Sequence, residues 1–222
     1  MLTSLLSNTS ELKVLLDDNF MKTVCDITPM IILGLHYNKS SNELFIGARD
    51  SGPMNLVTQY SSRPVIILGP GYKRKHTIEF NSEGKRLFTY PVRIDIDVNG
   101  IIYVIDRLDD KRHGRIVAVT RDGHVKFTYS GYELFNSSKL PFTPTDIAVT
   151  QSNSLVIADS DSHALHVLQT DGQLIGLQNT REVGITFPYS LCVDSEGFLL
   201  VGCNTFKNDT DTAKIHVVKL SI

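Results

Sequence analysis

The feature that most constrains the fold is a repeated order of short apolar segments. Three units begin at Pro91, Pro144 and Pro188, and a weaker copy begins at Pro29. In each unit an alternating apolar segment leads, through a polar turn such as Asn99-Gly100, to a more continuously apolar segment. Asn-Gly between two such segments predicts a hairpin with a type I′ turn, and a continuous apolar run predicts a strand that is buried on both faces.

A third and a fourth apolar segment complete the unit, with turn sequences such as Arg121-Asp122-Gly123 between them. Four short strands that recur roughly every 50 residues are typical of β-propeller blades. A four-stranded sheet that is apolar on both faces must be covered by a neighbouring sheet on each side. The small or β-branched residues Ile94, Ile147 and Ala148 suit crowded inner strands, and no segment carries a helical apolar period. We therefore expect an all-β propeller with almost no helix.

The repeats define the expected domain organisation. We predict one propeller domain over residues 1–222, with about four visible blades. The blade-like units are 29–90, 91–143, 144–187 and 188–222, and residues 1–28 are expected to be strands of a preceding or closing blade. The last unit lacks a clear fourth strand, which the segments 2–8 or 12–18 could supply. A ring that is not closed would expose an apolar edge and could self-associate.

One unit carries a recognisable motif. Residues Pro144–Val149, Leu155–Asp159 and Asp161–Val167 follow the order of an NHL repeat, in which His163 and Asp171-Gly172 fit. Asp146, Ser162 and Ala164 depart from that motif. The whole chain resembles the C-terminal regions of tripartite-motif (TRIM-NHL) proteins, in particular the TRIM-like sets of molluscs.

This resemblance implies a six-bladed propeller that recognises the substrate of an E3 ubiquitin ligase, and some relatives bind RNA. The RING and B-boxes that carry ligase chemistry in the family have no counterpart in this sequence. The expected partner is accordingly a protein or a ubiquitination substrate.

Composition excludes several classes of function. Lys and Arg number 22 against 24 Asp and Glu, so no overall positive charge attracts nucleic acid or anionic membrane. Cys25, Cys192 and Cys203 include no C-x-x-C pair and cannot build a zinc cross-brace, which favours reduced, buried thiols. The first residues lack the pattern of a signal peptide, and no apolar run approaches the roughly 20 residues of a membrane helix. We expect a cytoplasmic protein with no membrane partner.

No catalytic motif is visible in the sequence. His163 and His166 lie three residues apart, on opposite faces of a strand, and Asp159 and Asp161 lack the further ligands of a calcium loop. Asp106 and Asp159 are expected to cap the turn after the second strand of their units, where a carboxylate accepts backbone N–H bonds. We predict no enzyme, no cofactor and no metal. A propeller hydrolase or lyase, the third hypothesis, would need carboxylates or histidines that converge on the central channel.

Two basic segments predict an interaction rim. Its candidate residues are Tyr72, Lys73, Arg74, Lys75, Arg107, Lys111, Arg112 and Arg115. If both segments share one face, they can bind a protein partner together with the polar segment 203–212, because recognition residues concentrate on loops. The alternative is an RNA, whose backbone would contact the basic side chains while a base stacks on Tyr72.

Overall fold

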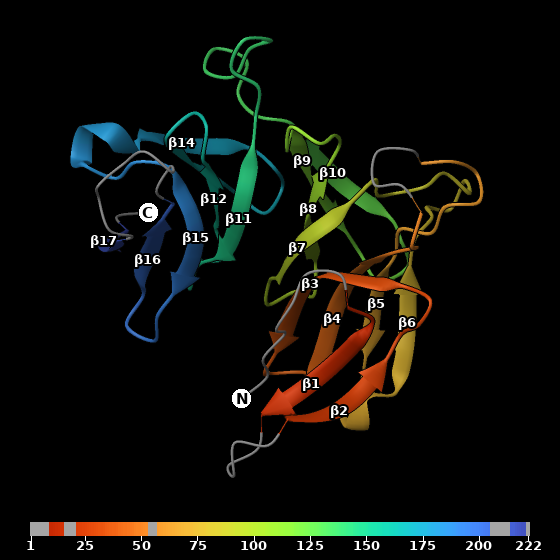
Figure 1. Cartoon of the computed structure of the whole chain (residues 1–222). Coiled ribbons are helices and arrows are strands. Elements are labelled where there is room, and N and C mark those ends of the chain that lie inside the picture. The colour runs from red at the N-terminus through yellow and green to blue at the C-terminus, as the bar shows by residue number, and fades with distance from the viewer. Residues whose placement is uncertain (1–8, 16–20, 53–56, 205–213, 221–222) are drawn as a thin grey trace.

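The computed structural model describes residues 9–15, 21–52, 57–204 and 214–220, and these form a four-bladed β-propeller (Figure 1). The strands in chain order are β1 (Glu11–Leu15), β2 (Met21–Asp26), β3 (Ile31–Asn38), β4 (Glu43–Arg49), β5 (Val65–Leu68), β6 (Arg74–Ile78), β7 (Pro91–Ile96), β8 (Ile102–Arg107), β9 (Gly114–Val119), β10 (Val125–Tyr129), β11 (Pro144–Val149), β12 (Leu155–Asp159), β13 (Ala164–Leu168), β14 (Leu174–Asn179), β15 (Pro188–Val193), β16 (Phe198–Cys203) and β17 (Ile215–Lys219). Helical structure among the described residues is limited to two short 3-10 turns, η1 (Pro70–Tyr72) and η2 (Thr180–Val183), and no described helix could cross a membrane. The all-β propeller expectation is confirmed.

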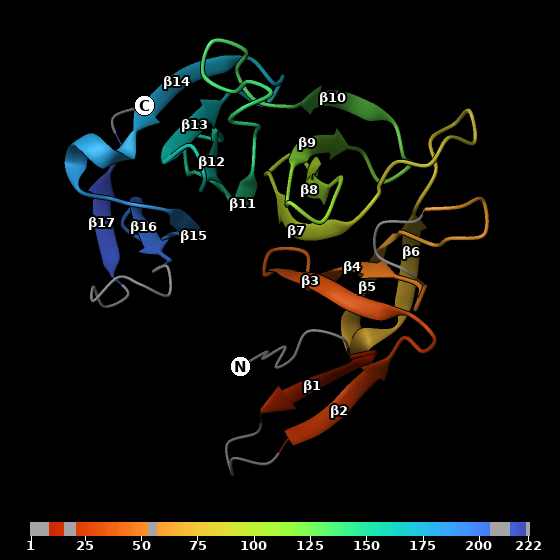
Figure 2. The ribbon, with the colours of Figure 1, turned by 45° about the horizontal axis from the view of Figure 1, so that its top comes forward.

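The blades follow one another along the chain. They are the antiparallel sheets β3–β6, β7–β10, β11–β14 and β15–β17, each with consecutive strands paired in order. Figure 2 shows the four sheets around an arc, with the first strand of each sheet innermost and the last outermost. Because the inner strands run side by side, two ends of the propeller can be distinguished. We call the end with the β3–β4 and β7–β8 turns the turn face, and the end with the β4–β5 and β8–β9 connections the link face.

The blades pack against one another through apolar side chains, and the two middle blades are covered on both sides. Strand β8 illustrates this: Ile102 and Val104 pack toward blade β3–β6, whereas Tyr103 and Ile105 pack toward blade β11–β14. All four side chains are fully buried. The continuous apolar run of the second strand thus serves two cores, as the sequence predicts, because alternate residues of a strand face opposite sides.

The hairpin turns differ in type from the prediction. At Asn99-Gly100 only Gly100 has a positive φ, of 79°, whereas a type I′ turn needs two such residues. The Asp97 carboxylate instead accepts hydrogen bonds from the backbone N–H groups of Asn99 and Ile101, at 2.9 and 2.8 Å. The preceding aspartate therefore holds a longer turn with one left-handed glycine.

The N-terminal strands do not complete the last blade. Within the described residues β1 pairs with β2, and together they cover blade β3–β6 through Leu12 and Ile27. Sheet β15–β17 has three described strands, and Ile215 and Val217 of its outer strand are 75 % and 65 % exposed. The segment 2–8, another candidate for the closing strand, lies outside the described residues.

Two glycines let the first two blades approach each other closely. A Cβ atom on Gly34 of β3 would lie 2.3 Å from the carbonyl oxygen of Val92, and one on Gly47 of β4 would lie 2.3 Å from that of Pro91. Both obstacles are backbone atoms of β7, which cannot move aside without shifting the whole blade.

Glu43 connects the same two blades through ion pairs. Its side chain is almost fully buried at the turn-face end of β4, where it pairs with Lys75 of β6 at 2.7 Å and with Arg121 in the β9–β10 turn of the next blade. The two cations, Arg121 first, lower the pKa of Glu43 to about 2. One carboxylate thus links two strands of one blade to a turn of the next.

We expect the substitution Gly34→Ala to destabilise the propeller. The added methyl group forces β3 and β7 apart, which costs about 2–3 kcal/mol of the free energy of unfolding, as overpacking of a core does. For a chain of this size that lowers the melting temperature by about 5–10 °C. Gly176→Ala is the matched control, because its Cβ meets only Val167 at 3.4 Å. Equal melting temperatures for the two variants would contradict the close approach of the blades.

The pH dependence of stability should report on Glu43. Its pKa is lower in the folded chain than in the unfolded one, so its stabilisation is complete above pH 4.5 and is lost as the pH falls toward 2. Chemical unfolding of the wild type should show a loss of about 3 kcal/mol over this interval that Glu43→Gln does not show. Glu83→Gln, at an exposed pair with Lys85, should behave like the wild type.

Candidate functional site

The first strands of the four blades line a central channel with a cavity of about 410 Å³, which is open between the first and last blades. Alternate residues of an inner strand face opposite ways. Ile94 and Ile147 therefore pack into the cores between blades, while Asp95 and Asp146 bring carboxylates to the cavity wall. The other polar side chains on this wall are those of His36, Arg93 and Cys192.

Each channel carboxylate joins two inner strands. Asp95 of β7 accepts from the backbone N–H of Ile96 at 2.7 Å and, with its other oxygen, from that of Val149 on β11 at 2.8 Å. Asp146 of β11 repeats the arrangement with Leu191 on β15, also at 2.8 Å. These bonds satisfy N–H groups on the inner edges of strands that have no further strand to pair with.

His36 and Asp95 form a dyad on the cavity wall. The Nδ1 atom of His36 on β3 lies 3.3 Å from Oδ1 of Asp95, and both side chains keep a minor exposed fraction. Burial lowers the pKa of His36, and the nearby carboxylate only partly offsets this effect. The imidazole is therefore neutral at pH 7, which leaves its second nitrogen able to accept a proton.

Asp146 and Arg93 form a second polar pair. Nε of Arg93 lies 3.6 Å from Oδ1 of Asp146, too long for a hydrogen bond. Burial raises the pKa of Asp146, while the N–H of Leu191 and the charge of Arg93 lower it. Arg93 keeps 41 % of its side chain exposed, so its guanidinium remains available to a ligand.

Neither this wall nor any other described part of the chain gathers three or more His, Cys, Asp or Glu side chains with the geometry of a metal site.

The histidines and aspartates that the sequence analysis singled out elsewhere are structural. Asp106 accepts from the backbone N–H groups of Thr89 and Tyr90, both at 2.7 Å, and Asp159 accepts from that of Thr143 at 3.1 Å. They bond as predicted, but to the connection that precedes the first strand of their blade, because the second strand ends beside it. His166 is fully buried, with its Nδ1 atom 2.7 Å from the hydroxyl of Tyr129.

The two basic segments of the predicted rim lie at opposite ends of the blades. Tyr72, Lys73, Arg74 and Lys75 lie at the turn-face end of β6, where Tyr72 packs against the core and Lys75 pairs with Glu43. Residues Arg107, Lys111, Arg112 and Arg115 lie in or beside the β8–β9 connection on the link face. The structure does not bring these segments together, because an antiparallel strand order places successive connections at alternate ends. Residues 205–212 of the predicted polar segment lie outside the described residues.

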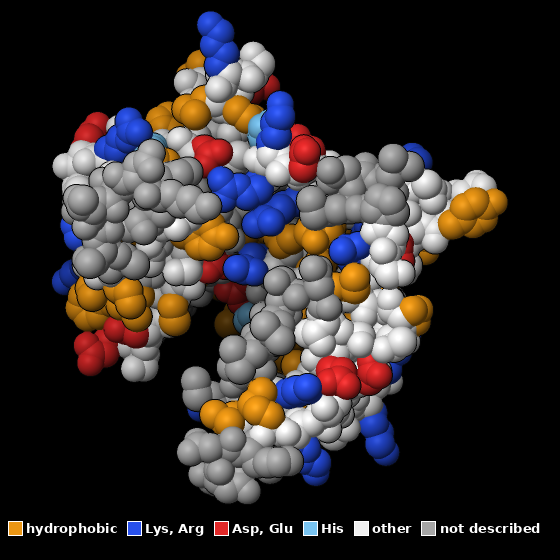
Figure 3. All heavy atoms as spheres, in the orientation of Figure 1, with side chains coloured by type: hydrophobic (Ala, Val, Ile, Leu, Met, Phe, Trp, Pro, Cys, Tyr) orange, Lys and Arg blue, Asp and Glu red, His pale blue; other side chains and the backbone are white. Residues whose placement is uncertain are grey.

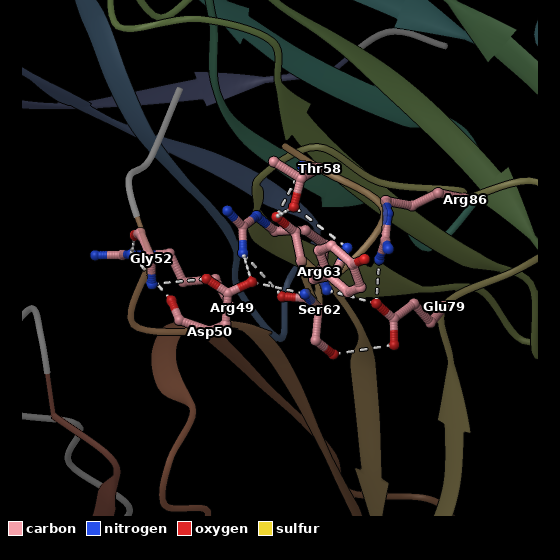
Figure 4. A network of polar contacts seen from close by, with 10 residues as sticks. Arg49, Asp50, Gly52, Thr58, Ser62, Arg63, Glu79 and Arg86 are labelled. Carbon is pink, nitrogen blue, oxygen red and sulfur yellow. Dashed lines mark hydrogen bonds and ion pairs between the residues drawn. The ribbon is translucent and has the colours of Figure 1, made fainter. Parts of the chain in front are cut away.

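Most link-face arginines have carboxylate partners. Arg115 pairs with Asp106 at 3.0 Å. Arg63 pairs with Asp50, and Arg86 with Glu79, in a network that fixes the β4–β5 connection (Figure 4). Arg107 differs: within the described part of the chain its side chain forms no ion pair or hydrogen bond, and its buried Nε atom is unsatisfied.

Sequence reasoning missed His36, Arg93, Asp95 and Asp146 as site residues. The available signal was a set of charged residues in the first strand of a unit, at positions that alternate with Ile94 or Ile147. Only the ring arrangement shows that these positions from different units meet.

Comparison with known proteins supports the fold. No protein-family profile and no curated protein matches the sequence. Among solved structures, a putative gluconolactonase is similar with a TM-score of 0.60 and 17 % identity, over 95 % of this chain and 67 % of that one. A luciferin-regenerating enzyme gives 0.62 and 12 %, over 97 % and 73 %. Virginiamycin B lyase from Staphylococcus aureus gives 0.53 and 13 %, over 96 % and 64 %.

The chain spans about two thirds of the length of these propellers, and at such identities the likeness shows the fold alone. It nevertheless corrects two expectations. The prediction of a chain without enzymatic activity is wrong, since the similar propellers are named as enzymes. The resemblance to TRIM-NHL proteins gains no support from any comparison. What the chain shares with known proteins is a propeller of the kind found in lactonases and lyases.

Proposed function

We propose that this chain is a propeller enzyme that hydrolyses a small ester or lactone in its central channel, with His36 as general base. The observation that carries the proposal is the dyad of His36 and Asp95 on the wall of a cavity of about 410 Å³. A neutral histidine oriented by a carboxylate is a common general base. The similarity to a propeller described as a putative gluconolactonase supports a lactone as the substrate class.

The chemistry follows from the two nitrogens of His36. The Asp95 carboxylate beside Nδ1 favours the tautomer with its proton there, so that Nε2 accepts a proton from water. The resulting hydroxide adds to the substrate carbonyl, and the ester C–O bond then breaks. The imidazolium returns its proton to the leaving oxygen, which restores the neutral histidine.

The substitution His36→Gln should abolish this activity. With γ-butyrolactone and p-nitrophenyl acetate as substrates, we expect kcat/KM to fall by about 10²-fold or more, the usual contribution of a general base. His76→Gln, at an exposed position on β6, is the control and should retain the wild-type rate.

The pH profile provides a second readout of the same proposal. Because only neutral His36 accepts a proton and its pKa is lowered, the acid limb of kcat/KM should have its midpoint below pH 6.5. Activity that is absent in the wild type on both substrates, or equal in wild type and His36→Gln, would overturn the proposal.

A second proposal is that the link face also binds a protein partner. The connection between β10 and β11 stands away from the sheets in Figure 1 and carries exposed apolar residues. Leu134 is 86 % exposed and Tyr132 39 %. Exposed apolar side chains that gather on one loop are typical of a protein contact.

Affinity capture tests this second proposal. Wild type and Leu134→Glu, immobilised at equal density, are incubated with the same cell extract and the retained proteins are quantified by mass spectrometry. A defined set of proteins that is retained by the wild type and lost in Leu134→Glu supports the contact. The same set on both surfaces contradicts it. Val98→Glu, at an 85 % exposed residue of the turn face, is the control.

A further inference from the structure

An arginine group lies at the link-face mouth of the channel. We propose that Arg93, Arg107 and Arg112 bind an oxyanion, a carboxylate or a phosphate group carried by a small ligand. The inference deepens the proposed function, since it assigns a negatively charged substrate to the same channel. In Figure 3 Lys and Arg side chains gather near the centre of the face drawn, beside the hollow between the first and last blades.

The three guanidinium groups come from neighbouring elements of one blade. Arg93 lies on inner strand β7 and lines the channel cavity, Arg107 ends β8, and Arg112 lies in the β8–β9 connection. Burial lowers the pKa of Arg107, and the charges of Arg93 and Arg112 lower it further. Repelling cations held together in this way are stabilised when an anion binds among them.

The available carboxylates do not neutralise the group. Arg112 lies 3.5 Å from Asp161, and Arg93 lies 3.6 Å from Asp146, so both contacts are long. Arg107 has no described carboxylate partner, whereas nearby Arg63, Arg86 and Arg115 each have one. Three arginines thus share two distant carboxylates, which leaves the group with an excess of positive charge.

The surroundings of Arg107 hold it in place. Its backbone N–H donates to the carbonyl oxygen of Tyr90 at 3.0 Å, and Tyr189 of the last blade also lies within electrostatic reach of its side chain. The Nε atom is buried without a hydrogen-bond partner. The buried Nε–H of Arg107 thus lacks an acceptor, and an oxyanion would relieve this by accepting its hydrogen bond.

Titration with small anions tests the inference. Sodium phosphate and sodium succinate are added separately to the full chain at constant ionic strength, which sodium chloride maintains, and the arginine Nε–Hε signals are followed by NMR. We expect saturable shifts of the Arg107 signal, which is identified by its absence from the spectrum of Arg107→Gln. Binding to that variant, followed on the remaining arginine signals, should be at least about tenfold weaker. Arg74→Gln, which removes one exposed arginine charge on the turn face, should bind as the wild type does.

The outcomes separate the sources of the anion. Binding of phosphate alone supports a phosphorylated ligand, and binding of succinate alone supports a carboxylate ligand. The inference is overturned if neither anion binds, or if Arg107→Gln binds either as tightly as the wild type. If neither small anion binds but an RNA hairpin binds to the wild type and not to Arg107→Gln, the arginine group is an RNA site and the inference is overturned.

A parallel titration of His36→Gln distinguishes this inference from the proposed function. Unchanged anion binding in that variant supports the arginine site independently of any hydrolysis. If the wild type hydrolyses the substrate but binds neither anion, the proposal for the dyad stands and only the inference about the arginine site is overturned.

Discussion

The structure depends on the fact that each blade is apolar on both faces. Tyr103 and Ile105 of β8 are buried toward one neighbour, and Ile102 and Val104 toward the other, so no single blade can exclude water by itself. The sheets must therefore stand side by side around an axis. This packing requires neighbouring sheets to approach closely. Gly34 and Gly47 allow it because they have no Cβ atom where β3 and β4 face the backbone of β7.

Radial packing has a consequence at the axis. The inner strands end the sheets, so their inward N–H groups have no strand partner, and an unpaired buried N–H is costly. Asp95 and Asp146 accept these groups from the next blade at 2.8 Å. The requirement that holds neighbouring blades together thus places two carboxylates on the channel wall. One of them already lies beside His36, so the dyad that we propose as the catalytic pair needs no additional scaffold.

The fold was predictable from the sequence because its causes are local. Alternation in the first strand and the continuous apolar run of the second are properties of single units. The motif resemblance also rested on residues that have structural roles within one blade. Asp159 accepts a hydrogen bond from Thr143, and Gly172 takes a positive φ of 91° in a turn. A propeller needs such residues whatever it does, so they identify the architecture and carry no information about the family. The site was not predictable in this way, since His36, Asp95 and Asp146 come from three units and meet only in the ring.

The order of charges along the channel limits what a ligand can look like. Arg93 and Asp146 each lie two residues after the proline that begins their strand, and Asp95, which contacts His36, lies two residues further along. Two residues of a strand span about 7 Å. A ligand whose anionic group contacts Arg93 at the link face therefore extends about that far to bring its reacting atom to the dyad. The spacing favours a compact molecule with its charge a few bonds from its carbonyl carbon, and disfavours one in which the two are adjacent.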